Sequence, residues 1–193
     1  VNNLEKRGYT TEIKTAPQSE ELVKELQSIS DEWLKEFNKK EIVFAEGKFD
    51  SNFIKNQDCI ILKDENNSIK AFLNIIPDFA KDECTYDMIR KTKDAPNGAM
   101  DLLILKTIDY TKSKNLRYLN LGMAPLSGIE NANNSAEELM KYAYNKVGRF
   151  KHYQSLRFFK EKYAQTWNNQ YLVYNHDTDL LQPPLTLSTI MKP

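Results

Sequence analysis

The spacing of apolar and polar residues predicts alternating strands and helices in the first third of the chain. Alternation rich in threonine and isoleucine predicts a strand from Tyr9 to Lys14. Apolar residues recur at helical spacing from Leu22 to Phe37, which predicts one amphipathic helix over residues 20–38. A short strand at 42–45 and a short helix that begins near Asp50 complete this part.

The middle of the chain predicts three neighbouring strands. The apolar runs 59–62 and 69–76 flank a cluster of turn-forming residues at 64–68, so together they predict a β-hairpin. Pro77 ends the second run, and residues 84–90 predict a third strand beside it.

A longer helix should follow these three strands. Asn97 is expected to cap it, and apolar residues at helical spacing extend it to about Lys114. Its inner face is predicted to comprise Met100, Leu103, Ile104, Thr107, Ile108 and Thr111.

The C-terminal part predicts short elements of both kinds. Residues 117–121 predict a strand that is buried on both faces if it runs parallel to its neighbour. Ser135, with Glu138 three residues later, forms the pattern of a capping box and opens a helix to about Val147. The remaining predicted elements are a helix at 155–163, a strand at 167–174 and a tail at 180–191.

This order of elements predicts an α/β protein with a mixed sheet and helices on both faces. It is the order of the GNAT-like acyltransferase fold, although a match of fold alone says little about function. We expect one domain over residues 1–193. Residues 1–14 contribute a helix end and the first strand, and residues 175–193 form a C-terminal tail.

Composition narrows the class of protein further. Lys plus Arg and Asp plus Glu both number 27, and zero net charge argues against coating nucleic acid by bulk attraction. No run of 18 apolar residues predicts a membrane span. Cys59 and Cys84 match no metal motif and are expected to be buried, reduced thiols. The N-terminal residues do not resemble a signal peptide, so the chain is interpreted as a piece of a longer protein.

Well-known catalytic motifs are absent from the sequence. It contains no dinucleotide-binding or phosphate-binding glycine loop, no zinc-protease motif and no nucleophile elbow. Ser127 has no histidine placed to activate it, and two histidines, His152 and His176, are too few to favour a zinc site. We therefore expect neither a metal nor a cofactor.

Asp87 and Arg90 are candidates for a polar site because they flank apolar residues in a predicted strand. Side chains alternate along a regular strand, so the two would face opposite sides unless the strand ends or bulges between them. A surface ion pair that contributes about 0 kcal/mol is the alternative. Asp101 lies in the first turn of a predicted helix, where a negative charge complements the helix dipole. Asn120 is a polar residue in a predicted buried strand and needs a hydrogen-bond partner there.

Residues 146–162 form the most basic stretch of the chain, with aromatic residues between the charges. Such a patch suits phosphate groups and single-stranded nucleic acid, or it is an ordinary helix with its lysines outside. An acidic segment over residues 78–87 could attract a cationic substrate or be a solvated loop. The basic residues of the stretch are Lys146, Arg149, Lys151, Arg157, Lys160 and Lys162.

Several ordered stretches are similar to one family. They resemble the C-terminal cytosolic domain of the multiple peptide resistance factor, or phosphatidylglycerol lysyltransferase, family. The similarity extends over about residues 4–174, and several long motifs in one order are more specific than a short motif. Ser155 stands where we expect glycine in the family. The similar stretches are 30–34, 87–90, 94–101, 120–127 and 156–163.

The resemblance implies an aminoacyltransferase. The family moves lysine, or in some members alanine, from aminoacyl-tRNA to the glycerol hydroxyl of phosphatidylglycerol at the inner face of the bacterial membrane. The implied partners are aminoacyl-tRNA, chiefly lysyl-tRNA, and phosphatidylglycerol, and the added charge repels cationic antimicrobial peptides. This soluble piece corresponds to the second of two GNAT-like halves, which follow a transmembrane flippase domain. Whether it is active alone stays open.

The resemblance also implies roles for single residues. Asp87 would hold the ammonium group of the amino acid, and Arg90 would pair with Asp87 or with a phosphate. Glu130 would be a polar wall residue, and Lys162 would contact phosphate or the terminal ribose. The implied substrate-binding residues are Asn97, Asp101, Asn120, Met123, Arg157 and Lys160.

Three alternatives remain at this point. An acetyl-CoA-dependent acyltransferase shares the fold, but Pro125 interrupts the loop that would cradle pyrophosphate. A non-catalytic tRNA- or lipid-binding module would need the basic stretch and not Asp87. Transferases that build peptidoglycan bridges are the third alternative.

Overall fold

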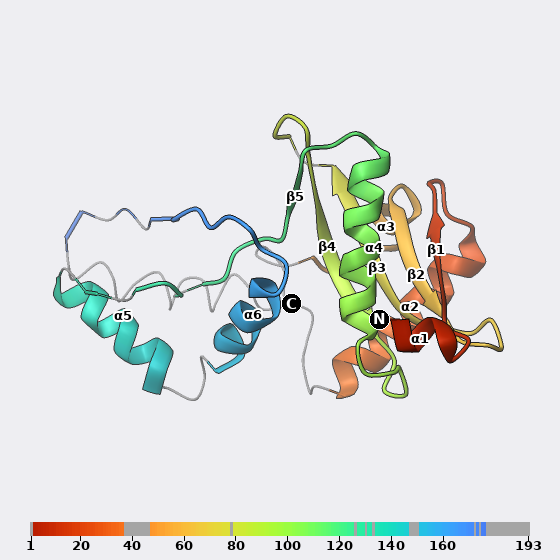
Figure 1. Ribbon diagram of the computed structural model, residues 1–193, viewed down its shortest axis with the longest axis horizontal. Coiled ribbons are helices and arrows are strands. Elements are labelled where there is room, and N and C mark those ends of the chain that lie inside the picture. Colours follow the sequence, from red (N-terminus) through yellow and green to blue (C-terminus); the bar gives the residue numbers. More distant parts are fainter. Residues whose placement is uncertain are drawn as a thin grey trace. The chain divides into compact units, whose positions relative to one another are not determined.

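The computed structural model describes most of the chain (Figure 1). Its described residues fall into two compact units, which we call the N-terminal unit, up to Asn120, and the C-terminal unit, from Leu121 on. The expectation of a single domain stays a prediction. The described residues are 2–36, 47–77, 79–125, 127–129, 131–132, 134–146, 151–171, 173 and 175–176.

The N-terminal unit is built on a five-stranded sheet in the order β1-β2-β3-β4-β5. The first four strands pair antiparallel, and β5 joins β4 in parallel. This mixed sheet, with helices against it, confirms the predicted α/β class. The strands are β1 (Thr10–Lys14), β2 (Asp58–Lys63), β3 (Ile69–Pro77), β4 (Glu83–Lys91) and β5 (Tyr118–Asn120).

The predicted β-hairpin is confirmed. Asp64 closes its turn because its carboxylate accepts bonds from the backbone N–H groups of Asn66 and Ser68, both at 2.9 Å. Asn67 takes the left-handed conformation at φ 63°, which asparagine tolerates better than most residues. The predicted third strand is β4, so the hairpin and its neighbour form the centre of the sheet.

Helices lie on both faces of the sheet, as predicted (Figure 1). α2 contacts β3 and β4, whereas α4 contacts β2, β3, β4 and β5. The predicted inner face of α4 is buried at Leu103, Ile104, Thr107 and Thr111. The helices of this unit are α1 (Asn2–Lys6), α2 (Glu20–Glu36), α3 (Ser51–Lys55) and α4 (Ala99–Ser113).

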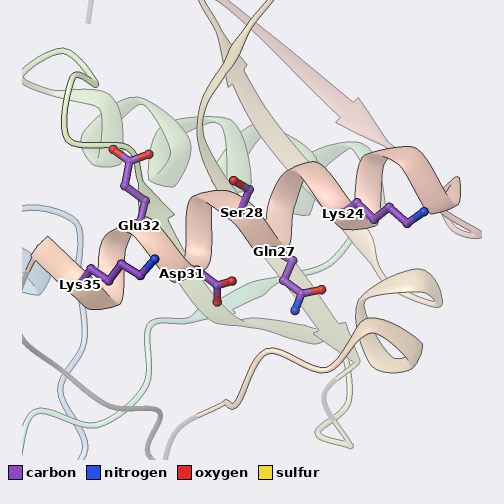
Figure 2. A pocket seen from close by; sticks show the side chains of 6 residues that line it. All are labelled: Lys24, Gln27, Ser28, Asp31, Glu32 and Lys35. Atoms are coloured by element: carbon purple, nitrogen blue, oxygen red, sulfur yellow. The ribbon is translucent and has the colours of Figure 1, made fainter.

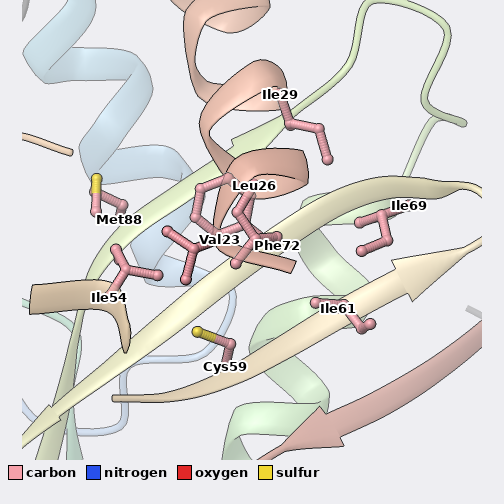
Figure 3. Close-up of a cluster of buried hydrophobic side chains, with 9 residues drawn as sticks. All are labelled: Val23, Leu26, Ile29, Ile54, Cys59, Ile61, Ile69, Phe72 and Met88. Carbon is pink, nitrogen blue, oxygen red and sulfur yellow. The ribbon is translucent and has the colours of Figure 1, made fainter. Parts of the chain in front are cut away.

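Alternating side chains of the central strands form a separate apolar layer on each face. Under α2 they join the helix in a buried cluster that also takes in Ile54 of α3 (Figure 3). Phe72 is fully buried there and meets the ring of Phe49 edge to face, with 6.3 Å between the centroids. The cluster comprises Val23, Leu26, Ile29, Ile54, Cys59, Ile61, Ile69, Phe72 and Met88.

The start of α4 differs from the prediction. Gly98, and not Asn97, occupies the N-cap position, at φ 87° and without a side-chain cap. Ala99 N donates to Pro96 O at 3.1 Å, so the chain turns through Asn97 and Gly98 before the helix begins. Only glycine adopts this φ without strain, and the helix therefore starts one residue later than an asparagine cap would place it.

Two further expectations for strands are wrong. β5 pairs with β4 in parallel, but Tyr118 and Asn120 are exposed, and β5 lies at the edge of the sheet that the described residues form. Residues 167–171 and 173 lie in no strand, although their aromatic alternation predicted one. Alternation only marks residues that suit a ladder; it does not supply the neighbouring strand that a ladder requires.

The C-terminal unit contains α5 (Ser135–Lys146) and α6 (Lys151–Glu161), which contact each other. Asn134 caps α5 in place of the predicted Ser135, since its side chain accepts from Glu137 N at 2.8 Å. α6 begins four residues before the predicted start at 155. The expected elements at 42–45 and 180–191 lie outside the described residues.

Removing the cap of α3 should have a small, local effect. Asp50 accepts bonds from Asn52 N and Phe53 N at 2.8 and 3.0 Å. We expect Asp50→Ala to lower the free energy of unfolding by about 1 kcal/mol, measured by urea denaturation. Asp50→Ser keeps a capping oxygen and should stay close to the parent protein. Equal losses in the two variants would contradict the capping role.

Candidate functional site

β4 carries a bulge at the position where the two candidate residues needed one. On β3 the single residue Asn74 lies between paired positions 73 and 75, whereas β4 has Asp87 and Met88 between their partners. An extra residue changes the face to which the following side chains point. This irregularity satisfies the condition under which Asp87 and Arg90 can belong to one site.

One backbone segment lies against both candidate side chains. A Cβ atom placed on Gly47 would lie 1.9 Å from Oδ2 and 2.1 Å from Oδ1 of Asp87. The carbonyl oxygen of Gly47 accepts a bond from Nη2 of Arg90 at 3.4 Å. Asp87 and Arg90 are thus brought together at Gly47, on the face of the sheet that α2 covers.

Arg90 is held by α2 as well as by Gly47. Its Nη1 donates to the hydroxyl of Ser30, and its guanidinium carbon lies 5.3 Å from the ring centre of Trp33. The side chain is buried, with 5% of its surface exposed. Hydrogen bonds and a cation–π contact are what a buried guanidinium requires, so Arg90 is an internal support of the site.

Tyr86, the neighbour of Asp87 on β4, is not a candidate for a general base. Burial raises the pKa of the neighbouring Tyr86 to about 12, so this phenol stays protonated at neutral pH. On the other edge of β4, the ladder to β5 covers only Glu83, Cys84 and Thr85. Within the described residues, the bulged half of β4 therefore lies beyond the end of its parallel ladder.

The other predicted residues of the N-terminal unit lie in different elements. Asn97 is exposed in the turn before α4, and Asp101 is half-buried in the first turn of that helix. Asn120 finds the partner that its strand position required, because its Nδ2 donates to Glu83 at 2.9 Å.

The remaining predicted residues belong to the C-terminal unit. Lys160 is buried, and its Nζ donates to the carbonyl oxygen of Met123 at 2.9 Å. Arg157 bonds Glu161 at 2.7 Å and stacks on Trp167, with 3.5 Å from Cζ to the ring centre. Lys160 thus ties α6 to the loop after β5, and Arg157 is paired along its own helix.

Lys162 and Glu130 complete the predicted set. Lys162 is exposed just after α6, and its Nζ lies 5.1 Å from the ring centre of Phe159. Glu130 lies outside the described residues, as does the side chain of His152. Of the basic stretch, the structure therefore separates a buried lysine at 160 from an exposed one at 162.

These two lysines should differ sharply when each is replaced by methionine. Lys160→Met leaves the Met123 carbonyl without this donor, and we expect a loss of about 1 to 3 kcal/mol in the free energy of unfolding. Lys162→Met removes an exposed charge and should change it by less than about 0.5 kcal/mol. Urea denaturation of both variants measures the difference. Equal effects would contradict a structural role for Lys160.

Three residues of this arrangement were not predicted as site residues: Trp33, Gly47 and Asn74. Trp33 belongs to one of the stretches that carry the family resemblance, which was an available signal. Asn74 was visible as the one polar side chain between Ile69 and Ile76 apart from Lys70. Gly47 gave no signal, because its closeness to Asp87 depends on the folded backbone.

A shallow pocket elsewhere on α2 offers less chemistry. Figure 2 shows its six lining side chains, all of them polar and all projecting from one helix. Two lysines and two carboxylates lie there together with neutral polar side chains, as on a solvated helix face. The lining residues are Lys24, Gln27, Ser28, Asp31, Glu32 and Lys35.

The described part of the chain holds neither a metal-ligand cluster nor a membrane-spanning helix. It contains no cluster of three or more histidine, cysteine or acidic side chains that could hold a metal ion. None of its helices is both long enough and apolar enough to cross a membrane.

Known proteins share both the sequence and the fold of this chain. A phosphatidylglycerol lysyltransferase of Bacillus subtilis is 34% identical over 181 residues, which are 93% of this chain and 21% of that protein. The enzyme of the same name from Staphylococcus aureus MRSA252 is 29% identical over 194 residues, with 22% of its length covered. The chain thus spans about a fifth of the length of these relatives.

Solved structures agree. The structure of L-PGS from Bacillus licheniformis superposes with a TM-score of 0.82 at 34% identity, over 98% of this chain and 57% of that one. A lysylphosphatidylglycerol synthetase C-terminal domain from Agrobacterium fabrum gives 0.79 at 29% identity, over 98% and 56%. An aminoglycoside acetyltransferase at 11% identity and a TM-score of 0.51 shows the fold alone, which confirms the GNAT-like prediction.

The family itself follows from the extent of the match. A family described as phosphatidylglycerol lysyltransferase, C-terminal, matches residues 1–174, nearly the whole chain. The match covers β4 with its bulge, the Gly47 segment and both lysines of the α6 region. The chain therefore belongs to the C-terminal family of the phosphatidylglycerol lysyltransferases.

Proposed function

We propose that this chain is the catalytic end of a transferase that moves lysine from lysyl-tRNA to a glycerol hydroxyl of phosphatidylglycerol. The observation that carries the proposal is the bulged β4 with Asp87 and Arg90 at Gly47, inside a family match over residues 1–174. The relatives carry the name of this reaction. The enzyme would act at the cytoplasmic face of the membrane, together with the first GNAT-like half and the transmembrane domain.

In this proposal Asp87 binds the ammonium group of the aminoacyl substrate. A carboxylate is the usual partner of an ammonium group, and the hydrogen bond between the two is charge-assisted. Arg90 is a positioning residue, since its guanidinium is engaged by Ser30, Gly47 and Trp33. Charge-assisted bonds to the substrate would fix the ester near the lipid hydroxyl, and such positioning supplies much of the rate in acyl transfer.

The reaction balances without a cofactor. The hydroxyl oxygen of the lipid glycerol attacks the ester carbonyl carbon of the aminoacyl-tRNA and forms the new C–O bond. The bond to the terminal ribose oxygen breaks, and the proton of the lipid hydroxyl passes to that oxygen. Lys162, exposed after α6, is proposed to contact a phosphate of one substrate, while Arg157 and Lys160 hold α6 in shape.

Two other functions predict different products. An acetyl-CoA-dependent acyltransferase would label an acceptor from acetyl-CoA, and the low identity to acetyltransferases supports the fold alone. A non-catalytic binding module would retain tRNA or lipid without transferring label. Lysyl transfer is favoured because the relatives described above, at 29% and 34% identity, carry names of that chemistry.

The decisive experiment uses the intact protein in vesicles that contain phosphatidylglycerol. Lysyl-tRNA and alanyl-tRNA, each radiolabelled on the amino acid, are supplied separately, and lipid is extracted for counting. We expect label in the lipid with lysyl-tRNA and dependence on phosphatidylglycerol in the vesicle. Folded protein that leaves the label on both tRNAs would overturn the proposal, and acetyl-CoA would then be tested as donor.

A further inference from the structure

We propose that Asn74 is a positioning residue that sets the bulge of β4 and thereby the place of Asp87. The inference deepens the proposed function and rests on it, because it concerns the same site. Asn74 is fully buried on β3, directly opposite the two bulged residues Asp87 and Met88. It does not need to touch substrate in order to act.

The bulge creates a demand that the side chain of Asn74 meets. An extra residue in one strand disrupts the local ladder, so a backbone N–H of the bulge needs another acceptor. Met88 N donates to Oδ1 of Asn74 at 2.8 Å. Because Met88 itself is buried, water is a poor substitute for this acceptor.

A second buried amide fixes the direction of the first. Nδ2 of Asn74 donates to Oε1 of Gln57 at 2.8 Å, so its Oδ1 faces Met88. The backbone carbonyl oxygen of Gln57 in turn accepts from Nε2 of Gln18 at 2.7 Å, and the same Nε2 donates to the backbone oxygen of Lys14. A chain of amides therefore runs from the end of β1 to the bulge.

This chain explains why the bulge lies between residues 86 and 89 and not elsewhere on β4. Apolar side chains at the same position on β3 would favour the regular ladder, in which each residue of β4 faces one residue of β3. Oδ1 of Asn74 is satisfied only in the register that places the backbone N–H of Met88 opposite it. In that register Asp87 lies at Gly47, next to the Gly47 oxygen that Arg90 binds.

The test replaces Asn74 in the intact protein and measures transfer in phosphatidylglycerol vesicles. Asn74→Leu has a similar size and no acceptor, so we expect kcat/KM for lysyl-tRNA to fall about 100-fold as Asp87 is displaced. Asn74→Asp keeps the acceptor for Met88 N and should retain more activity than Asn74→Leu. Gln18→Leu breaks the same amide chain at its far end and serves as the control for lost stability.

The effect of Asn74→Leu in an Asp87→Asn background separates positioning from general damage. If Asn74 acts through Asp87, the second substitution adds less than about twofold to the loss caused by the first, because coupled residues are not additive. Equal losses of kcat/KM in Asn74→Leu and Gln18→Leu would overturn the proposal. So would a double variant in which the losses of Asn74→Leu and Asp87→Asn multiply in full. Full activity of Asp87→Asn alone would overturn it too.

Hydrogen exchange distinguishes this inference from the proposed function. The amide of Met88 is expected to exchange slowly in the wild type and in Gln18→Leu, and at least tenfold faster in Asn74→Leu. This readout requires no substrate. An inactive wild type with a protected Met88 amide would overturn the proposed function but not the role of Asn74 in setting the bulge. Unchanged exchange of the Met88 amide in Asn74→Leu would overturn that role alone.

Discussion

Replacing Asp87 with asparagine is expected to lower kcat/KM for lysyl transfer about 100-fold to 1,000-fold, similar to the cost of removing one preorganised hydrogen-bonding group from an active site. The substitution is nearly isosteric, so the neighbouring Gly47 segment should stay in place. It removes the negative charge that we propose binds the ammonium group of the substrate. Initial rates with lysyl-tRNA and phosphatidylglycerol vesicles measure the effect.

A matched change on α4 shows whether charge loss in general is responsible. Asp109 is exposed on that helix and lies 3.8 Å from Lys106, a weak surface pair. Asp109→Asn should therefore transfer lysine at nearly the wild-type rate. If Asp87→Asn keeps wild-type kcat/KM, the carboxylate does not bind the aminoacyl group. If Asp87→Asn binds tRNA but does not transfer lysine, the result supports an enzyme over a non-catalytic binding module.

Strands and helices of the N-terminal unit were predictable because apolar spacing determined them locally. The hairpin around Asp64 is an example, since the turn residues and both flanking runs are contiguous in sequence. Arg90 was identified as a candidate for a similar reason, because a charge in an apolar strand must find partners. Those partners on α2, Ser30 and Trp33, lie about 60 residues away in sequence.

The bulge could not be read from the sequence, because it depends on a choice between two registers. A period-2 pattern does not say where a strand gains a residue, and the deciding contact joins Asn74 to Met88 N. The error at Asn97 has a related cause, since Gly98 supplied a backbone conformation that outweighs a side-chain cap. In both cases the outcome is a backbone conformation, and the residue types alone allow more than one.

Gly47→Ala is expected to reduce kcat/KM for lysyl transfer about 100-fold, in proportion to a displacement of roughly 1 Å at Asp87. A methyl group there would stand 1.9 Å from Oδ2 of Asp87, far inside van der Waals contact. The φ of Gly47 lies outside the left-handed region, so alanine itself fits the backbone. Either the carboxylate must rotate away or the segment must withdraw.

Both responses separate groups that the wild type holds together. Rotation of the carboxylate moves the charge from the substrate, and withdrawal of the segment also weakens the bond from Arg90 to the Gly47 oxygen. Asp50→Ser changes the same segment without this clash and should remain active. Because the methyl group acts on the carboxylate, Gly47→Ala should cost little in an Asp87→Asn background. A loss of equal size in both backgrounds would contradict this. It would mean that Gly47 is needed for folding and that the methyl group does not act through the Asp87 carboxylate.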